Sequence, residues 1–421
     1  MPLYHAPLFN AIRGWYTQSH RKLRQGCPCL WENSPVFPAP AERKAVYLME
    51  IVRKTVSCGE PYPLARLGDE RKILFIDIET TGFSRENNAI YLIGCGIPEG
   101  NRLRIVQFFA DRGDEAELLD AFFRFLDPYR LLIHFNGKNF DLPFIRARAE
   151  RYGIRAAFPE DLDIYQEARK LRGLLALPGL KQKDIERFLG IRREDKMGGG
   201  ELIGVYQDFL HDRDGEKRRL LLLHNADDVA GMPEILPILS YRDFLSGGFA
   251  LDSTEVVETP PGQAARSLRA QWTGCTDLPV PVHTAITLDH KKRGSGREVS
   301  PILGTALLTG RKVRLTLPLY EGELRHFYPD YKDYYYFADR DCAIHRSIAR
   351  FMDSPDRRKA TAKTCYTRAS GIFLPEPSAV FTPVMQQDYH SPLLFAPWRE
   401  DLFSSPESAE EYVREVLRLL L

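Results

Sequence analysis

The stretch ILFIDIETTGF, residues 73–83, decides the fold of the middle of this chain. Its apolar beginning predicts a buried β-strand, and two acidic residues, Asp77 and Glu79, stand where the strand ends. Side chains two positions apart on a strand point to the same face, so these two carboxylates are neighbours. Neighbouring carboxylates repel each other and lose hydration, so the pattern indicates either a strand end in solvent or a pair that holds a divalent cation.

A third acid follows another strand signal in IHFNGKNFDLPFI, residues 133–145. The apolar run ends at Phe135, the residues Asn136 and Gly137 predict a turn, and Asp141 enters the first turn of a predicted helix. Taken alone, Asp141 is explained by the favourable interaction of an acid with a helix N-terminus. Its position after a strand also makes it a candidate partner for the first two carboxylates.

A fourth acid lies in LLLLHNADDVAGM, residues 220–232. His224 and Asp228 are four positions apart, so on a helix they share one face, and the apolar block before them predicts that this face looks inward. The alternative is a core histidine beside a surface aspartate. Asp227 is adjacent, and a shift of one residue would exchange the two aspartates, but Asp228 is the one in register with His224.

The three segments, in this order, resemble the motifs of the DEDD superfamily of exonucleases, which have the ribonuclease H-like fold. NGKNFDLPFI and LHNADDV are most similar to the bacterial YprB-type ribonuclease H-like domain, and the resemblance covers about residues 71–242. It implies that four acids hold metal ions and that a histidine helps to activate water. These catalytic candidates are Asp77, Glu79, Asp141, Asp228 and His224, and the candidates for substrate contact are Asn136, Phe140 and Thr80.

One feature departs from the family pattern. Histidine members of the superfamily usually place the histidine one residue further from the aspartate, whereas tyrosine members use the spacing found here between His224 and Asp228. The role of His224 as the base is therefore less firmly implied than the metal role of the acids.

The donor chemistry points to the same activity. Four carboxylates without a cysteine suit Mg²⁺ or Mn²⁺, which prefer oxygen ligands. Two such ions about 3.5–4 Å apart activate water and stabilise the leaving oxygen of a phosphodiester. We expect Asp77 to bridge both ions, Glu79 and Asp228 to favour one, and Asp141 the other. The expected function is a 3′-5′ exonuclease acting on DNA or RNA; the alternatives are an inactive nucleic-acid-binding protein and a structure-selective endonuclease.

The chain divides into three parts. Residues 1–70 form an N-terminal extension that is partly helical, with a helix predicted over 41–54. Residues 71–242 read as three strands, a helix, a strand and further helices, which predicts an α/β fold: a ribonuclease H-like mixed sheet with flanking helices. Residues 243–421 form a β-rich α+β region whose fold we do not assign, with helices predicted over 339–352 and 405–421.

The C-terminal region carries aromatic and basic residues typical of nucleic-acid contact. The aromatic candidates are Tyr331, Tyr334, Tyr335 and Tyr336, and the basic candidates are Arg357, Arg358, Lys359, Lys363 and Arg368 together with the loop HKKRGSGR at 290–297. The alternative is that the aromatic residues pack a core and the basic residues are merely solvated.

Composition narrows the class of protein. The chain has 421 residues, 44% apolar and 27% charged, which is typical of a globular protein. Its net charge of +1 excludes a strong overall positive charge that would attract nucleic acid to the whole surface. No apolar run approaches the ~18 residues of a membrane span, and no signal peptide is recognisable, so we expect a cytoplasmic protein without a membrane partner. Seven cysteines suit a reducing compartment, and Cys27 and Cys29 lack a matching second half of a zinc site.

Overall fold

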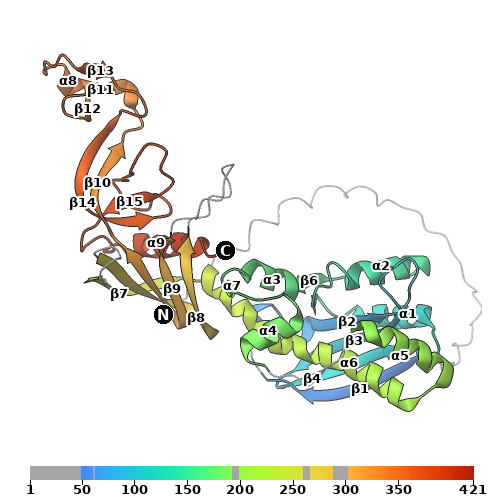
Figure 1. Cartoon of the computed structure of the whole chain (residues 1–421). Helices are drawn as coiled ribbons and strands as arrows, with labels where there is room; N and C mark the ends of the chain where they lie inside the picture. Colours follow the sequence, from blue (N-terminus) through green and yellow to red (C-terminus); the bar gives the residue numbers. More distant parts are fainter. Residues whose placement is uncertain (1–48, 60–61, 192–198, 259–265, 288–301) are drawn as a thin grey trace, which may run out of the picture. The chain divides into compact units, whose positions relative to one another are not determined.

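The structure is a computed structural model that describes residues 49–59, 62–191, 199–258, 266–287 and 302–421. Its central element is a six-stranded sheet in the order β1-β4-β3-β2-β5-β6 (Figure 1). The strands β1 to β4 pair antiparallel, while β2, β5 and β6 run parallel, so the sheet is mixed. Their bounds are β1 (Glu50–Ser57), β2 (Ile73–Thr80), β3 (Ile90–Glu99), β4 (Arg102–Phe109), β5 (Leu131–His134) and β6 (Glu160–Asp163).

Helices cover both faces of this sheet. Leu74, Ile76 and Ile78 of β2 pack in one core with residues of α1 and α2, whereas Ile73 and Phe75 pack in another with residues of α3, α4 and α6. The period-two alternation therefore directs Asp77 and Glu79 to the α6 face. The helices are α1 (Glu115–Leu126), α2 (Asp141–Arg151), α3 (Ile164–Leu171), α4 (Gln182–Leu189), α5 (Gly199–Asp212), α6 (Gly215–Ile235) and α7 (Leu239–Ser246). The predicted α/β class and mixed sheet with flanking helices are confirmed.

The helix predicted over residues 41–54 is wrong in its second half. Residues 50–54 lie in β1, which pairs antiparallel with β4 along its whole length. A helical spacing of apolar residues was present, but eight residues of backbone pairing with a neighbouring strand outweigh such a weak local preference. Residues 41–48 and the Cys27–Cys29 pair lie outside the described residues.

The C-terminal region contains three small sheets, each of three strands. The first has the order β7-β8-β9 and packs against the helix α9. The second has the order β10-β14-β15, and the third the order β12-β11-β13. The strands are β7 (Phe249–Glu258), β8 (Arg266–Thr287), β9 (Ile302–Pro318), β10 (Tyr320–Phe327), β11 (Tyr334–Phe337), β12 (Cys342–His345), β13 (Arg357–Lys359), β14 (Tyr366–Glu376) and β15 (Leu394–Pro397).

Two helices complete this region, and short 3-10 helices link other elements. The predicted C-terminal helix is α9 (Pro406–Arg418), whose apolar stripe is buried and whose first turn is capped by Ser405. The helix predicted over 339–352 is wrong in its first half, because Cys342–His345 pair with β11 as the strand β12 and leave only α8 (Arg346–Ala349) helical. The 3-10 helices are Leu64–Arg66, Glu70–Lys72, Leu236–Ile238 and Tyr331–Asp333.

In the described residues, no helix has the length and apolar character that a membrane span requires.

Candidate active site

The end of β2 is the centre of an acidic site. Asp77 accepts a hydrogen bond at its Oδ2 from Asn225 Nδ2 of α6 at 2.9 Å. Glu79 is buried, and its Oε1 lies 3.8 Å from His224 Nε2. The same imidazole nitrogen lies 3.4 Å from Asp228 Oδ2. The structure therefore brings β2 and α6 together so that His224 stands between two carboxylates.

Small residues on β3 allow α6 to approach the sheet this closely. A Cβ added at Gly94 would lie 2.1 Å from Asn225 Oδ1, and one at Gly96 would lie 2.8 Å from a Val229 methyl group. Any larger side chain at either position would push α6 away from β2. The sequence IGCGI of β3 thus sets the distance at which the two halves of the site meet.

Asp141 reaches the same place from the other side of the sheet. It begins α2, is buried, and accepts a hydrogen bond at Oδ1 from the backbone N–H of Ile78, between the two acids of β2. A carboxylate held by the backbone of β2 in this way is fixed relative to Asp77 and Glu79.

The turn before Asp141 is held by two residues that the sequence analysis missed. Buried Asp163, at the end of β6, accepts hydrogen bonds from the backbone N–H groups of Asn136 at 2.9 Å and Lys138 at 3.2 Å, and it also caps α3. Buried His134 accepts one from Gly137 N at 3.1 Å through Nδ1. Asn136 has a positive φ of 62°, which this network stabilises. The sequence signal was Asp163 immediately before a helix, typical of an N-cap.

The electrostatics of the site are those of carboxylates crowded together. Loss of hydration, followed by repulsion from Asp141, Glu79 and Asp228, raises the pKa of Asp77 well above its ordinary value. The same two causes raise the pKa of Glu79 to about 8. Loss of hydration raises the pKa of Asp141 to about 7, against opposing hydrogen bonds. Each acid is thus costly to ionise until a positive charge is supplied.

The donor set fits a hard divalent cation, whereas the side-chain arrangement is not a ready-made cage. All four acids offer oxygen, which Mg²⁺ and Mn²⁺ prefer, and no cysteine lies among them. As the side chains stand, no group of three or more His, Cys, Asp or Glu residues in the described part of the chain is positioned to hold an ion. Rotation of the carboxylates toward one another, which their repulsion now opposes, would be required.

An aromatic pair with one exposed ring adjoins Asp141 in the sequence: Phe140 directly precedes this acid and is partly buried, and Phe83 is exposed. The Phe83 side chain is 78% exposed, and its ring meets that of Phe140 edge-on at 6.4 Å between centroids. Sequence analysis proposed Phe140 for substrate contact but missed Phe83, although it closes the quoted stretch as an apolar residue after a turn. Such an exposed ring offers a base a surface on which to stack.

The other predicted contact residues are engaged within their own loops. Thr80 is buried, and its Oγ1 donates a hydrogen bond to the carbonyl oxygen of Gly82 at 2.7 Å. Asn136 accepts one at Oδ1 from Asn139 Nδ2 at 2.8 Å. Both residues therefore shape the loops beside the acids in this structure.

Three of the four candidate C-terminal tyrosines are half-buried and have partners within the chain. Tyr334 stacks on Tyr328 at 4.8 Å, Tyr335 lies under the Arg357 guanidinium, and Tyr336 donates a hydrogen bond to Asp341. This favours the packing interpretation for these three rings, while Tyr331 is more exposed.

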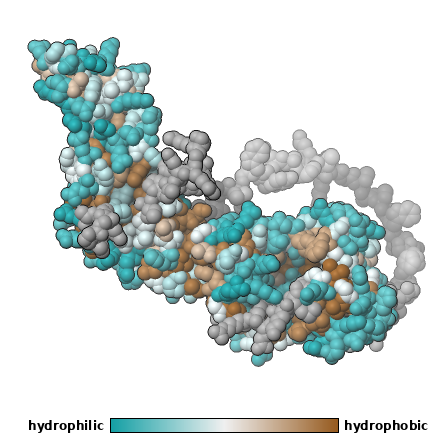
Figure 2. Space-filling model, in the orientation of Figure 1, coloured by the Kyte–Doolittle hydropathy of each residue, from teal (hydrophilic) through white to brown (hydrophobic). Residues whose placement is uncertain are grey.

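Figure 2 shows a largely hydrophilic face over β11–β13, where Arg358 and Lys359 are exposed. Lys363 is exposed, Arg368 pairs with Glu323, and the loop 290–297 lies outside the described residues.

Comparison with known proteins agrees with the fold. Residues 74–239 match the family model of the RNase_H superfamily. Residues 74–239 therefore form a ribonuclease H-like domain. "Uncharacterized protein YprB" of Bacillus subtilis (strain 168) is 26% identical over 197 residues, which are 44% of this chain and 46% of that protein. The chain therefore matches less than half the length of this curated relative.

Solved structures give weaker likenesses. The family B DNA polymerase of Pyrobaculum calidifontis aligns with 62% of this chain and 35% of its own, at 13% identity and a TM-score of 0.33. Exonuclease I of E. coli in complex with a dT13 oligonucleotide aligns with 50% of this chain and 54% of its own, at 12% identity and a TM-score of 0.28. Likenesses of this size carry no argument about the activity of the ribonuclease H-like domain described above.

Proposed function

We propose that this protein is a divalent-metal-dependent nuclease, and that it acts as a 3′-5′ exonuclease on DNA or RNA. The ribonuclease H-like fold supports a nuclease. The observation that carries the proposal is the meeting of acids from three separate segments: Asp141 accepts a hydrogen bond from Ile78 N, between Asp77 and Glu79, and His224 Nε2 lies between Glu79 and Asp228. Loss of hydration, followed by repulsion from Asp141, Glu79 and Asp228, raises the pKa of Asp77. Carboxylates that are held together despite lost hydration and mutual repulsion are typical of sites that bind cations.

The residues divide the work of hydrolysis among them. Asp77, Glu79, Asp141 and Asp228 would hold the cations. The bound cations would lower the pKa of the attacking water and neutralise the leaving oxygen. His224 Nε2, 3.8 Å from Glu79 Oε1 and 3.4 Å from Asp228 Oδ2, would accept the proton that the water loses. Asn225 would orient Asp77, and the Phe83–Phe140 pair would stack on a base next to the scissile phosphate.

The first experiment incubates end-labelled single-stranded DNA and RNA with the purified chain and Mn²⁺ or Mg²⁺. We expect a ladder of products shortened from the 3′ end, which EDTA and the Asp141→Asn variant both abolish. Asp120→Asn, on the exposed side of α1, is the matched control and should retain activity, because it removes a carboxylate outside the site. Absence of cleavage on every substrate and metal would contradict the proposal.

A catalytically inactive nucleic-acid-binding protein is the second candidate. It is favoured by the side-chain arrangement, which is not a ready-made ion cage in the described residues, and by the unusual spacing of His224. This candidate predicts binding of labelled DNA or RNA without cleavage. A circular single strand separates the endonuclease alternative, because an exonuclease has no end at which to begin.

A further inference from the structure

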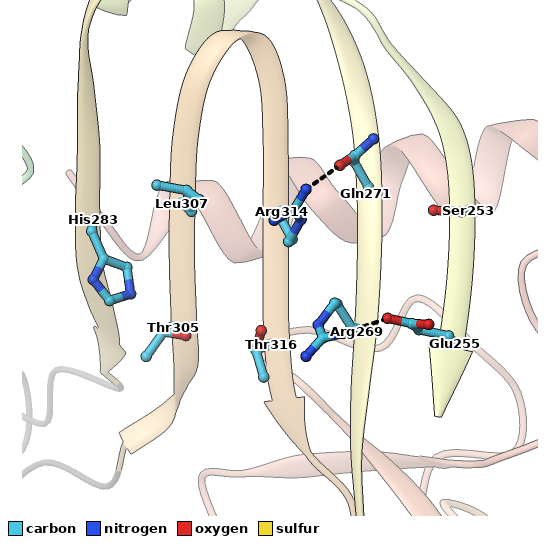
Figure 3. A pocket seen from close by; sticks show the side chains of 9 residues that line it. All are labelled: Ser253, Glu255, Arg269, Gln271, His283, Thr305, Leu307, Arg314 and Thr316. Carbon is cyan, nitrogen blue, oxygen red and sulfur yellow. Dashed lines mark hydrogen bonds and ion pairs between the residues drawn. The ribbon is translucent and has the colours of Figure 1, made fainter. Parts of the chain in front are cut away.

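A hollow lies on the polar face of the sheet β7-β8-β9, away from the carboxylate site. It has a volume of about 670 Å³, and its walls come from all three strands. Figure 3 shows the two halves of β9 joined at the top of the view, with Thr305 and Leu307 on one half facing Arg314 and Thr316 on the other. The hollow is therefore formed by a ribbon that doubles back on itself.

Glycines permit this fold-back. Gly310 has a φ of +55° and separates the two halves of β9, and the outward side chains change there from odd to even positions. Gly304 has a φ of +152°, and a Cβ at this position would lie 2.3 Å from the carbonyl oxygen of Thr316. The two halves thus meet backbone to backbone, which holds Thr305 and Thr316 close together.

Strand pairing arranges its side chains in rows. Arg269 stands directly between Glu255 of β7 and Thr316 of β9, and Gln271 stands between Ser253 and Arg314. The opposite faces of β8 and β9 are buried: Trp272 meets Phe403 ring to ring at 6.0 Å. One face of the sheet is anchored in a core, so the polar face is presented on a rigid support.

The chemistry of the lining is that of a site for anionic oxygen. Seven of the nine lining residues can donate hydrogen bonds through their side chains, Glu255 can only accept, and Leu307 is apolar. Arginines, hydroxyls and amides are the groups that proteins use to contact phosphate oxygens. Phe, Tyr and Trp are missing from the lining of this hollow, and His283 is its one aromatic ring, so the hollow offers little surface for stacking successive bases.

We propose that this hollow binds a single strand of nucleic acid through its sugar–phosphate backbone, without reading the bases. Arg269 and Arg314 contact successive phosphates, while Ser253, Thr305 and Thr316 donate to their oxygens. The choice of nucleic acid over another phosphodiester polyanion rests on the proposed nuclease function. The contact itself needs no hydrolysis.

Glu255 restrains this contact. Its Oε1 lies 2.6 Å from Arg269 Nη1, and both side chains are about half exposed. An exposed pair of this kind stabilises the protein by less than about 1 kcal/mol, so a phosphate can replace Glu255 as the partner of Arg269. Arg314 Nη2 donates a hydrogen bond to the uncharged Gln271 Oε1 at 3.0 Å, and a phosphate can replace this acceptor as well.

The test measures fluorescence anisotropy of a labelled oligothymidylate of about 30 nucleotides in EDTA, where hydrolysis cannot occur. We expect Arg269→Gln with Arg314→Gln to weaken binding about tenfold or more and to lower the dependence on salt, because about two phosphate contacts are lost. Glu255→Gln should tighten binding about twofold to threefold, because it removes a repelling charge. Arg269→Lys with Arg314→Lys should retain most of the affinity.

An exposed pair on α1 supplies matched controls. Arg124 pairs with Asp120 on the surface, and Arg124→Gln and Asp120→Asn should leave binding unchanged. Thymidine monophosphate in place of the oligonucleotide distinguishes a strand site from a site for free phosphate groups, and equal affinity for both would contradict the strand. If the double arginine variant fails to fold, Glu255→Gln still decides, because unchanged or weaker binding would contradict the proposal. If the unmodified chain binds the oligonucleotide but does not cleave it once Mn²⁺ is supplied, that result contradicts the nuclease function and leaves the strand-binding proposal in place.

Discussion

The acidic site and the polar hollow both place charged side chains on a sheet, but the acids are buried and the charged residues of the hollow are exposed. Asp77, Glu79 and Asp141 lie between the sheet and its helices, where their pKa values are raised by lost hydration. Arg269 and Glu255 lie on an open face and keep much of their hydration. The first arrangement makes charge unfavourable until a cation arrives, and the second keeps charges available for exchange with a ligand. We therefore expect variants in the acidic site to change chemistry and variants in the hollow to change affinity.

The largest effect should come from Asp77→Asn. A carboxylate between two cations contributes several kcal/mol to transition-state stabilisation, so single-turnover hydrolysis should fall by about 10³-fold or more. Thermal stability at pH 8 should not fall, because the substitution removes a group that is repelled by its neighbours. Circular dichroism melts monitor the fold. A variant that hydrolyses DNA or RNA at a rate within tenfold of the unmodified chain would contradict the metal role of Asp77.

His224 tests whether proton transfer occurs at the acidic site. His224→Gln should lower the single-turnover rate by about 100-fold, within the usual range for loss of a general base. His224→Tyr should retain more activity than His224→Gln, because the spacing to Asp228 is the one that tyrosine members of the family use. If both variants are equally impaired, the side chain at position 224 does not act as a general base.

Asp163 tests whether the turn before Asp141 positions that acid, and the expected effect is smaller than those above. Asp163→Asn should lower activity and Mn²⁺ affinity by about 10-fold to 100-fold, because the turn that carries Asp141 loses one of the two carboxylate oxygens that accept its backbone N–H groups. Asp161→Asn is the matched control: Asp161 contacts the side chains of His134 and Lys138 at the same sheet edge, but in the described residues it accepts no hydrogen bond from a backbone N–H of that turn. Isothermal titration with Mn²⁺ separates lost affinity from lost turnover. Equal effects of both substitutions would contradict a positioning role.

The smallest effect is a pH dependence of stability. The folded chain keeps protons on Glu79 up to about pH 8 and on Asp141 up to about pH 7, whereas the unfolded chain releases them near pH 4. The folded state therefore binds more protons in this window, and the metal-free protein should lose stability as the pH rises from about 4 to 8.

Mn²⁺ should oppose this loss. At about 100 times its dissociation constant it should contribute about 2.7 kcal/mol, which is a Tm increase of about 3 °C for a chain of 421 residues that unfolds as a whole, and more at pH 8 than at pH 5.5. Glu376, in β14, is buried and its pKa is also raised, to about 7, so it contributes to the same pH dependence without metal. Glu79→Gln should remove the Mn²⁺-dependent part and leave the part from Glu376. A Tm that Mn²⁺ does not change at any pH would contradict the account.

The same contrast explains what the sequence could predict. Asp77, Glu79, Asp141 and Asp228 could be proposed as candidates because each stands at a strand end or on a helix face that a few adjacent residues define. Asp163 was missed because β6 is the short acidic segment EDLD, which has no apolar pattern and is a strand only through its pairing with β5. The hollow was missed because Arg269 and Arg314 become neighbours only through the pairing of β8 with β9, and Thr305 joins them only through the fold-back at Gly310. A site can be predicted when its residues lie close together in the sequence at a regular spacing. A surface whose residues become neighbours only through the register of paired strands cannot be predicted in this way.

The most direct test of the central claim is a crystal of the chain soaked with Mn²⁺ and measured at the manganese absorption edge. The account predicts anomalous peaks between Asp77, Glu79, Asp141 and Asp228, with their carboxylates turned toward the ion, and no such peaks in the Asp77→Asn variant. Crystals in which Mn²⁺ binds elsewhere, or leaves these four carboxylates without an ion at saturating concentration, would contradict it.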